Sequence, residues 1–537
     1  MKRWTGITAL LLVVTWWTPS FGQGQPKDPS HGRSPEQLGT VDFPNSCSPA
    51  VQDTFQRGVA MLHSFWFTET EKTFREVLAQ DPSCAVATWG IAAILMLNPL
   101  AGTGSSPKGA EQAQAAIDQG RRIGAKTPRE RDYIEAVAAY YQDWASRPER
   151  ARQESRAKAF EGLAARYPDD DEAQIFYAVY LAATQSPTEQ TYATSLKAAE
   201  ILERQFVKHP DHPGVAHYLI HSYDYPPIAS KGLGAAKRYA QIAPAAPHAL
   251  HMPSHIFTRV GAWADSVATN RRSALVAIRG NEPDEALHAS DYMVYAYLQL
   301  ARDAEARRTI AEAEQVNGFN PARFTAPYAL AAMPARYAIE RGAWRQAARL
   351  QPQMSKYPFT EALTHFARAL GAARSGDPAL ADKEVQELVR LRDALKAAKN
   401  DYWATEVEVN RLGAAAWTAW AQSRHEEALS LMRSAADTED KSEKHIVTPG
   451  RIVPARELLG ELLLSLNRPT EALKEFEASQ TREPDRFRGL YGAAQAAAQV
   501  NDNNRAKRYF GRLMEIAGQG DPRPELEQIR TFLAAKP

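Results

Sequence analysis

The hydrophobic positions of this chain fall mostly in alanine-rich stretches, with few runs of β-branched residues. Such stretches are typical of helices, so the pattern predicts an all-α protein. A small residue, an aromatic residue and a proline recur within them at fixed offsets. Gly58, Phe74 and Pro82 stand at offsets of 0, 16 and 24, and Phe160 and Pro168 keep the last interval. The regular recurrence of these residues indicates that similar helical units follow one another along the chain.

A period of 34 residues relates the features in the middle of the chain. His217 and His221 recur at this interval as His251 and His255. Pro210 and the small residues around these pairs keep the same interval. A period of this length indicates an internal repeat built from one helix–turn–helix unit.

The clearest repeat lies near the C-terminus. Gly460 is followed by Ala472, Phe476 and Pro484 at the spacing of small residue, aromatic residue and terminal proline. Together with the 34-residue period, this spacing resembles the tetratricopeptide-repeat (TPR) family, with Arg456 where the family often has tryptophan.

The resemblance implies an all-α, TPR-type helical-hairpin solenoid with a right-handed superhelix. We expect about nine or ten hairpins over residues 49–534, interrupted by a loop near 438–454. In the family, the first helix of each hairpin lines a concave groove that binds protein or peptide ligands. A protein or peptide partner in such a groove is therefore expected here, on a scaffold whose repeats bury their faces against one another.

Histidines collect on the side of the first helices that faces the groove in the TPR frame. Each His-x3-His pair spans one helical turn, so both rings leave the same face, and the two pairs occupy equivalent places in adjacent repeats. Neutral imidazoles suit Zn, Cu or Ni, and a nearby carboxylate could complete the shell. We predict that one divalent transition metal binds here. The candidate ligands are His217, His221, His251, His255, Asp224 and Asp291.

Two other interpretations of the histidines stay open. They could hydrogen-bond a peptide or an acidic partner, or they could be duplicated with their repeats and satisfied by backbone or solvent. The sequence has no HExxH motif and nominates no general base, so a metal-dependent, hydrolase-like enzyme is an alternative but not the favoured one. A purely structural assembly scaffold is the other alternative. The candidate groove residues are His248, His288, Tyr295, Arg259, Arg336, His445, Arg456 and Glu457.

The interrupting loop supplies part of that set. His445 lies within it, while Arg456 and Glu457 follow it, and we expect them to form a secondary site, a plain linker being equally favoured. Arg336 and Glu340 are an i, i+4 pair, expected either to clamp a carboxylate or to form a solvated ion pair.

The N-terminus carries the pattern of an export signal. A basic start, an apolar run over 7–17 and small residues near Gly22 predict a signal peptide at 1–22. The polar segment 23–48 is expected to be a flexible leader. The protein is then periplasmic or secreted, with no stable membrane insertion after cleavage, because no later stretch is long and apolar enough to cross a bilayer.

Cysteine content and charge refine this interpretation. Cys47 and Cys84 are the two cysteines of the chain, and in an oxidising compartment we expect them to form a disulfide, the alternative being two separate small buried residues. The 537 residues carry 64 Lys and Arg against 63 Asp and Glu, a net charge of +1. Such a balance argues against a nucleic-acid partner.

Overall fold

The computed structural model describes residue 1 and residues 37–534, and this part of the chain is helical, without a strand. The helices of its first half are η1 (Pro49–Val51), α1 (Gln52–His63), α2 (Phe67–Gln80), α3 (Ala87–Leu95), α4 (Pro107–Ile123), α5 (Pro128–Tyr141), α6 (Glu149–Arg166), α7 (Asp171–Ala182), α8 (Ala193–Lys208), α9 (Pro213–Tyr223), η2 (Ala229–Gly232), α10 (Leu233–Ile242), α11 (Pro247–His251), α12 (Pro253–Arg259) and α13 (Trp263–Arg279). Those of its second half are α14 (Pro283–Gln299), α15 (Asp303–Ala313), α16 (Thr325–Glu340), α17 (Trp344–Ala347), α18 (Pro358–Ser375), α19 (Pro378–Ala397), α20 (Asp401–Ala421), α21 (His425–Glu439), α22 (Ala455–Ser465), α23 (Pro469–Arg482), α24 (Phe487–Gln499), α25 (Asn503–Ala517) and α26 (Pro524–Ala534).

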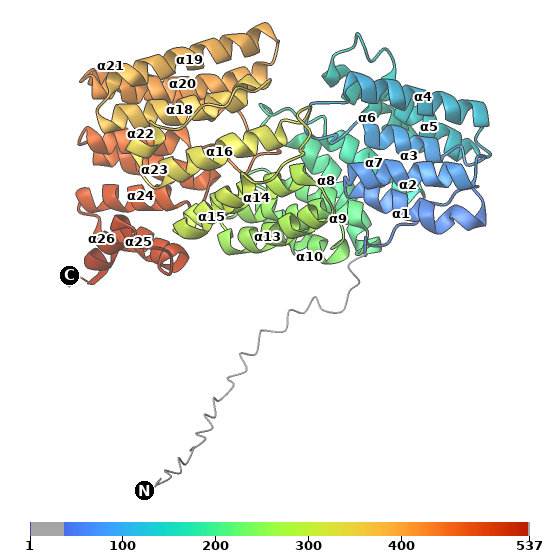
Figure 1. Ribbon diagram of the computed structural model, residues 1–537, viewed down its shortest axis with the longest axis horizontal. Coiled ribbons are helices and arrows are strands. Elements are labelled where there is room, and N and C mark those ends of the chain that lie inside the picture. The colour runs from blue at the N-terminus through green and yellow to red at the C-terminus, as the bar shows by residue number, and fades with distance from the viewer. Residues whose placement is uncertain (2–36, 535–537) are drawn as a thin grey trace. The chain divides into compact units, whose positions relative to one another are not determined.

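Consecutive helices pack against each other in pairs, and each pair packs on the next (Figure 1). This confirms the expected TPR-type arrangement of helical hairpins. The described residues hold twelve pairs, more than the nine or ten expected. Their spacing varies along the chain, because some helices, such as α19 and α20 of 20 and 21 residues, are long. The pairs are α1/α2, α3/α4, α5/α6, α7/α8, α9/α10, α11–α12/α13, α14/α15, α16/α17, α18/α19, α20/α21, α22/α23 and α24/α25.

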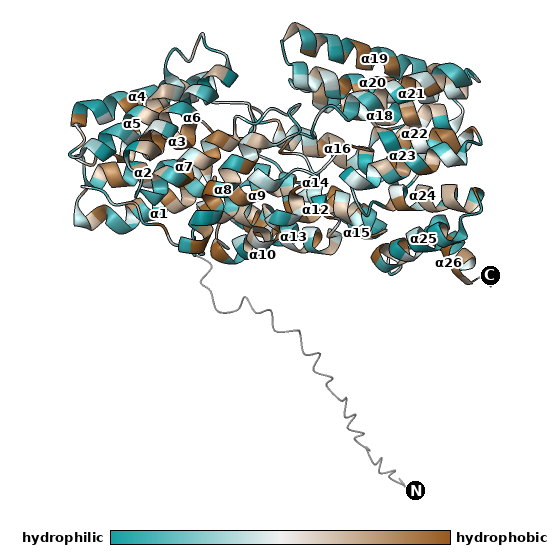
Figure 2. Cartoon of the chain, turned by 180° about the vertical axis from the view of Figure 1, so that it is seen from behind, coloured by the Kyte–Doolittle hydropathy of each residue, from teal (hydrophilic) through white to brown (hydrophobic). Residues whose placement is uncertain are grey.

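Small residues at the helix crossings explain the repeat pattern. The ring of Phe476 on α23 lies between Gly460 on α22 and Gly492 on α24. A Cβ atom on these glycines would lie 2.7 and 2.2 Å from that ring. An aromatic side chain therefore fills the space that two glycines leave open. Many helices of the chain show apolar and polar residues on different faces (Figure 2).

The segment before the first hairpin is packed over part of its length, contrary to the expected flexible leader over 23–48. Phe43 is fully buried and stacks on Trp89, with ring centroids 5.0 Å apart. Cys47 and Cys84 form a disulfide that ties this segment to the start of the second hairpin. Apart from Met1, the expected signal peptide at 1–22 lies outside the described residues, as does the leader up to residue 36.

The loop expected near 438–454 runs between α21 and α22, over residues 440–454, and we call it the strap. Its hydrogen bonds reach helices far away in sequence. The Gly450 carbonyl accepts from Arg336 on α16, and the Val447 carbonyl accepts from Tyr292 on α14. No helix among the described residues is both long and apolar enough to span a membrane.

Candidate metal centre

Six buried histidines gather where α9, α11, α12 and α14 meet, and none of them is more than 7% exposed. They form two groups in which the ring nitrogens lie within 4.8 Å of one another. The α9 triad is His217 and His221 on α9 with His248 on α11. The α14 triad is His251 on α11, His255 on α12 and His288 on α14.

Pairs of rings are brought together by helical spacing and by the break between α11 and α12. Pro253 starts α12 directly after Met252, so the two short helices continue one another and keep His251 and His255 one turn apart. The ring of His288 lies close to that of His251, with centroids 4.2 Å apart and the ring planes tilted by 49°. The sequence-predicted pairs are therefore each completed by a third histidine from a neighbouring position.

The tautomer of His251 is fixed by Asn270 on α13. The Asn270 amide nitrogen donates to the Ser266 carbonyl at 2.7 Å, which leaves its Oδ1 as the acceptor for His251 Nδ1 at 2.6 Å. His251 therefore carries its proton on Nδ1 and has a lone pair on Nε2.

The tautomer of His255 is fixed in the same way by Asp224. Its Nδ1 donates to Asp224 Oδ2 at 2.9 Å. Burial alone would raise the pKa of Asp224, but Lys444 and Arg259 outweigh it and hold the pKa well below its usual range. The carboxylate is therefore an acceptor, and the lone pair of His255 also lies on Nε2.

The two lone pairs meet. His251 Nε2 lies 3.1 Å from His255 Nε2, although neither nitrogen carries a proton in these tautomers. Burial lowers the pKa of His255 to about 4 and that of His288 to about 3, so the rings are neutral near pH 7. Neutral imidazole is the form that binds a metal. When one ring nitrogen of a histidine binds a metal, the other usually donates a hydrogen bond that fixes the orientation of the ring, as Nδ1 does here.

The α9 triad repeats this arrangement. His217 Nδ1 donates to the His63 carbonyl at 2.6 Å, and His248 Nδ1 donates to Glu285 Oε2 at 3.2 Å. Ring centroids lie 4.9 Å apart for His217 and His221 and 5.1 Å apart for His217 and His248. Burial lowers the pKa of His217 and His221 well below the usual value, so these rings are neutral too.

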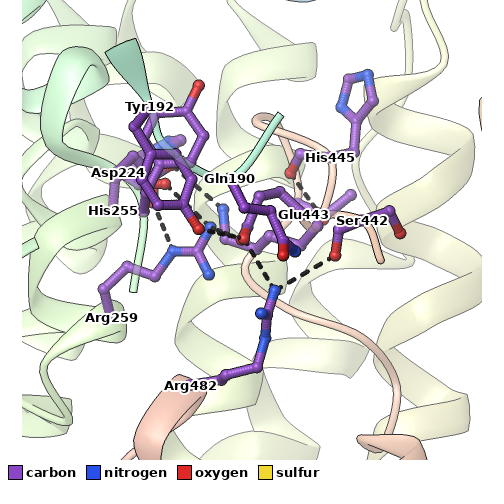
Figure 3. Close-up of polar contacts among 12 residues, drawn as sticks. Gln190, Tyr192, Asp224, His255, Arg259, Ser442, Glu443, His445 and Arg482 are labelled. Carbon is purple, nitrogen blue, oxygen red and sulfur yellow. Dashed lines mark hydrogen bonds and ion pairs between the residues drawn. The ribbon is translucent and has the colours of Figure 1, made fainter. Parts of the chain in front are cut away.

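A network of polar contacts links the strap to Asp224 and His255 at this centre (Figure 3). Glu443 accepts hydrogen bonds on one oxygen from Tyr192 and from Arg482, both at 2.8 Å. Lys444 Nζ lies 3.2 Å from Asp224 Oδ2, the oxygen that also accepts from His255. The strap is therefore linked to the α14 triad through a single carboxylate oxygen.

The two carboxylates nominated as metal ligands are engaged elsewhere. Asp224 accepts from His255 and Arg259 and pairs with Lys444, so it orients a ring instead of standing among the grouped ring nitrogens. Asp291 pairs with Arg336 at 3.4 Å, and burial raises its pKa to about 6 against the effect of that arginine.

The i, i+4 pair expected between Arg336 and Glu340 does not form. Arg336 is fully buried and donates to the strap carbonyls of Gly450 and Arg451, while Glu340 pairs with Arg486 at 2.6 Å. Because both side chains are buried against internal partners, neither is a free clamp for an external carboxylate, and neither is a solvated ion pair.

Of the remaining groove candidates, Glu457 and Tyr295 share a partner, while Arg456 and His445 contact other residues. Glu457 pairs with the buried Arg486 at 2.8 Å, and Tyr295 contacts the same guanidinium. Arg456 pairs with Asp440 at 2.5 Å, and His445 stacks on Trp403 with ring centroids 5.0 Å apart. The structure therefore does not bring His445, Arg456 and Glu457 into one secondary site.

The repeat frame of the sequence predicts His248 and His288 in the groove and does not predict them as metal ligands. The spacing His248-x2-His251-x3-His255 carries the signal, because residues three and four apart share one helical face. Nothing in the spacing indicates Asn270, Tyr292 or Lys444, which come from other helices and from the strap.

Comparison with protein-family models and with curated proteins found no match. Among solved structures, the chain is similar to the APC/C hetero-tetramer Cut9-Hcn1, at 11% identity and a TM-score of 0.30, over 89% of this chain and 95% of that one. It is also similar to yeast Tom70, at 13% identity and a TM-score of 0.30, over 89% of this chain and 87% of that one. At these TM-scores neither similarity carries an argument about the function of this chain.

Proposed function

We propose that this protein is a metal-binding helical-repeat protein and that the α14 triad binds one transition-metal ion. The observation that carries the proposal is the 3.1 Å approach of His251 Nε2 and His255 Nε2, with both Nδ1 atoms held as donors. Two lone pairs at this distance repel each other unless a cation lies between them and accepts both.

Protons alone do not account for the arrangement. The Tyr292 hydroxyl lies 3.2 Å from His255 Nε2 and can donate to it, but it leaves His251 Nε2 facing only another lone pair. Protonating either ring instead would place a charge in a site whose burial lowers the pKa of both histidines below 6.5.

A metal ion fits the donor set and the spacing. Nitrogen ligands on a tetrahedral zinc, at about 2.0–2.1 Å from the ion, lie about 3.3 Å from each other, close to the separation seen here. Three imidazoles are a common donor set for Zn or Cu, and Ni accepts imidazole as well. Asn270 and Asp224 would hold two of the rings in the binding tautomer.

We propose binding and not catalysis as the role of this ion. The three rings are at most 7% exposed, which leaves little room for a substrate beside the ion in this conformation. The signal pattern at 1–22 supports placing the protein outside the cytoplasm, periplasmic or secreted. A protein or peptide partner in the groove stays a prediction.

Metal analysis of untagged protein tests the proposal. Wild-type protein should retain Zn, Cu or Ni near one equivalent or more after gel filtration, and His288→Phe should lose one equivalent. The His288 ring packs against His251 and Tyr292 and forms no hydrogen bond with the described residues, so phenylalanine removes a ligand and retains an aromatic ring at this position. His365→Phe is the control, because His365 is as buried but pairs with Glu384 at 2.6 Å on α18 and α19.

Two results would overturn the proposal. One is wild-type protein that contains no metal and takes up none of the three ions in a calorimetric titration. The other is equal metal content in wild type and His288→Phe, with both proteins folded by circular dichroism.

A further inference from the structure

We infer that the α9 triad binds a second metal ion, so that the six histidines form a two-metal centre. The inference extends the proposed function, but it rests on different atoms and can stand or fall separately. The residues that carry it are His217, His221 and His248, whose ring nitrogens lie within 4.8 Å of one another.

The first observation is a set of buried ring nitrogens without hydrogen-bond partners. Nε2 of His217, Nε2 of His248 and both ring nitrogens of His221 contact no donor or acceptor among the described residues. A buried polar atom that is left unsatisfied costs about 1–3 kcal/mol, so four in one place are a large cost for a stable fold. A metal ion bound by three rings would satisfy three of the four nitrogens.

The second observation is that the unpaired nitrogens are the ones free to bind. His217 and His248 donate through Nδ1 to a carbonyl and to a carboxylate, which leaves the lone pair of each on Nε2. Metal-binding histidines are usually held by such a partner on the other nitrogen. The hydrogen bonds made by Nδ1 of these rings therefore leave the lone pairs on Nε2 facing one another, and none of these bonds places a donor between the Nε2 atoms.

A third cluster in the same fold shows what satisfied histidines look like. His63 and His212 also lie with a carboxylate, Glu172, in a buried group. Here every ring nitrogen has a partner: His63 bonds Tyr218 and Glu172, while His212 bonds Glu172 and accepts from the Val215 amide. The fold thus satisfies buried histidines with ordinary hydrogen bonds where they are structural, and it does not do so in the α9 triad.

The two triads adjoin each other. Ring centroids are 5.6 Å apart for His221 and His255 and 5.9 Å apart for His248 and His251. Each triad is made of imidazoles alone, and neutral ligands add no charge to offset two ions. Glu285, which accepts from His248, supplies negative charge beside the α9 triad, whereas Asp224 is already paired with Arg259 and Lys444.

The test is the stoichiometry of metal bound by variants of each triad. Apo protein without a tag is loaded with Zn²⁺ or, separately, Cu²⁺, passed over a desalting column with a weak chelator, and analysed for metal. We expect two equivalents in wild type, one in His221→Phe, one in His288→Phe and none in the double variant. The control His365→Phe should hold two.

Stability of the apo variant separates loss of a site from loss of the fold. Both nitrogens of His221 are unpaired, so phenylalanine removes no hydrogen bond, and a buried apolar ring is favoured over an unsatisfied imidazole. The thermal midpoint of apo His221→Phe should therefore equal or exceed that of apo wild type. A fall of several degrees would overturn the inference, because it would show that His221 has a structural partner.

The metal counts distinguish this inference from the proposed function. One equivalent in wild type, kept in His221→Phe and lost in His288→Phe, overturns the second site alone. One equivalent that is lost in His221→Phe and kept in His288→Phe overturns the proposed site and supports the α9 triad. Wild type that binds neither Zn²⁺ nor Cu²⁺ overturns both.

Discussion

Asn270 should control metal affinity without contacting the metal. Its Oδ1 accepts from His251 Nδ1 at 2.6 Å and holds the lone pair of the ring on Nε2. In Asn270→Ala this acceptor is gone, and the proton can move to Nε2, where it would donate to His255 Nε2 at 3.1 Å. That hydrogen bond stabilises the apo protein and must be broken before the ion can bind.

The expected loss follows from the role of such partners. Removing a group that orients a metal-binding histidine weakens metal affinity by about 10–100-fold, or about 1.4–2.8 kcal/mol. The apo protein should lose less than this, because the new hydrogen bond between the two rings compensates in part for the missing one. Competition against a chromogenic zinc chelator measures the affinity, and urea denaturation of apo protein measures the stability.

Ser273→Ala is the matched control for Asn270→Ala. Ser273 lies one turn further along α13 and donates to the Pro247 carbonyl at 2.8 Å, so it joins the same two helices without touching a ring. Its loss should cost stability of the same order and leave the affinity unchanged. Equal zinc affinity in wild type and Asn270→Ala, with fully folded protein, would refute the assignment of Asn270 as a positioning residue.

Three further predictions concern stability. The free energy of unfolding of apo protein should fall by about 3 kcal/mol between pH 6.5 and pH 5 because of His255 and His288. Their pKa values are lowered to about 4 and about 3 in the folded state, so in this range the unfolded chain binds protons at these histidines and the folded protein does not. A urea midpoint that does not change over this range would contradict the prediction. Replacing both Cys47 and Cys84 by serine should cost about 3–4 kcal/mol by loop entropy, measured by urea denaturation and refuted by an unchanged midpoint. Gly492→Ala should cost about 1–3 kcal/mol, because its Cβ would meet Phe476. Thermal melting should show no such loss in Gly511→Ala, where nothing lies within 4 Å.

The fold could be predicted because the helix crossings in different repeats need a small residue at the same position, and this need is visible in the sequence. Gly460 must be small because Phe476 lies against it, and Gly58 and Phe74 meet the same requirement at the other end of the chain. The packing of residues 37–48 could not be predicted, because the segment is polar in composition and its buried residues follow no periodicity. Phe43 stacks on Trp89, and Cys47 is bonded to Cys84.

The candidate site could be predicted only where its residues share a helix. His217 and His221, like His251 and His255, share a helical face by spacing alone, so their convergence was visible in the sequence. The groups that decide what these rings can bind come from elsewhere.

A histidine pair has the same spacing whether its rings bind a metal or form hydrogen bonds with other residues. The difference lies in which ring nitrogen is occupied, and the occupant of His251 Nδ1 is Asn270, 19 residues away, while that of His217 Nδ1 is the His63 carbonyl, 154 residues away. Such partners are set by the packing of whole helices and leave no local pattern. A metal site can therefore be proposed only from the three-dimensional structure. There, four rings donate through Nδ1 and keep their lone pairs on Nε2, unlike the buried histidines His63 and His212, whose ring nitrogens are all hydrogen-bonded.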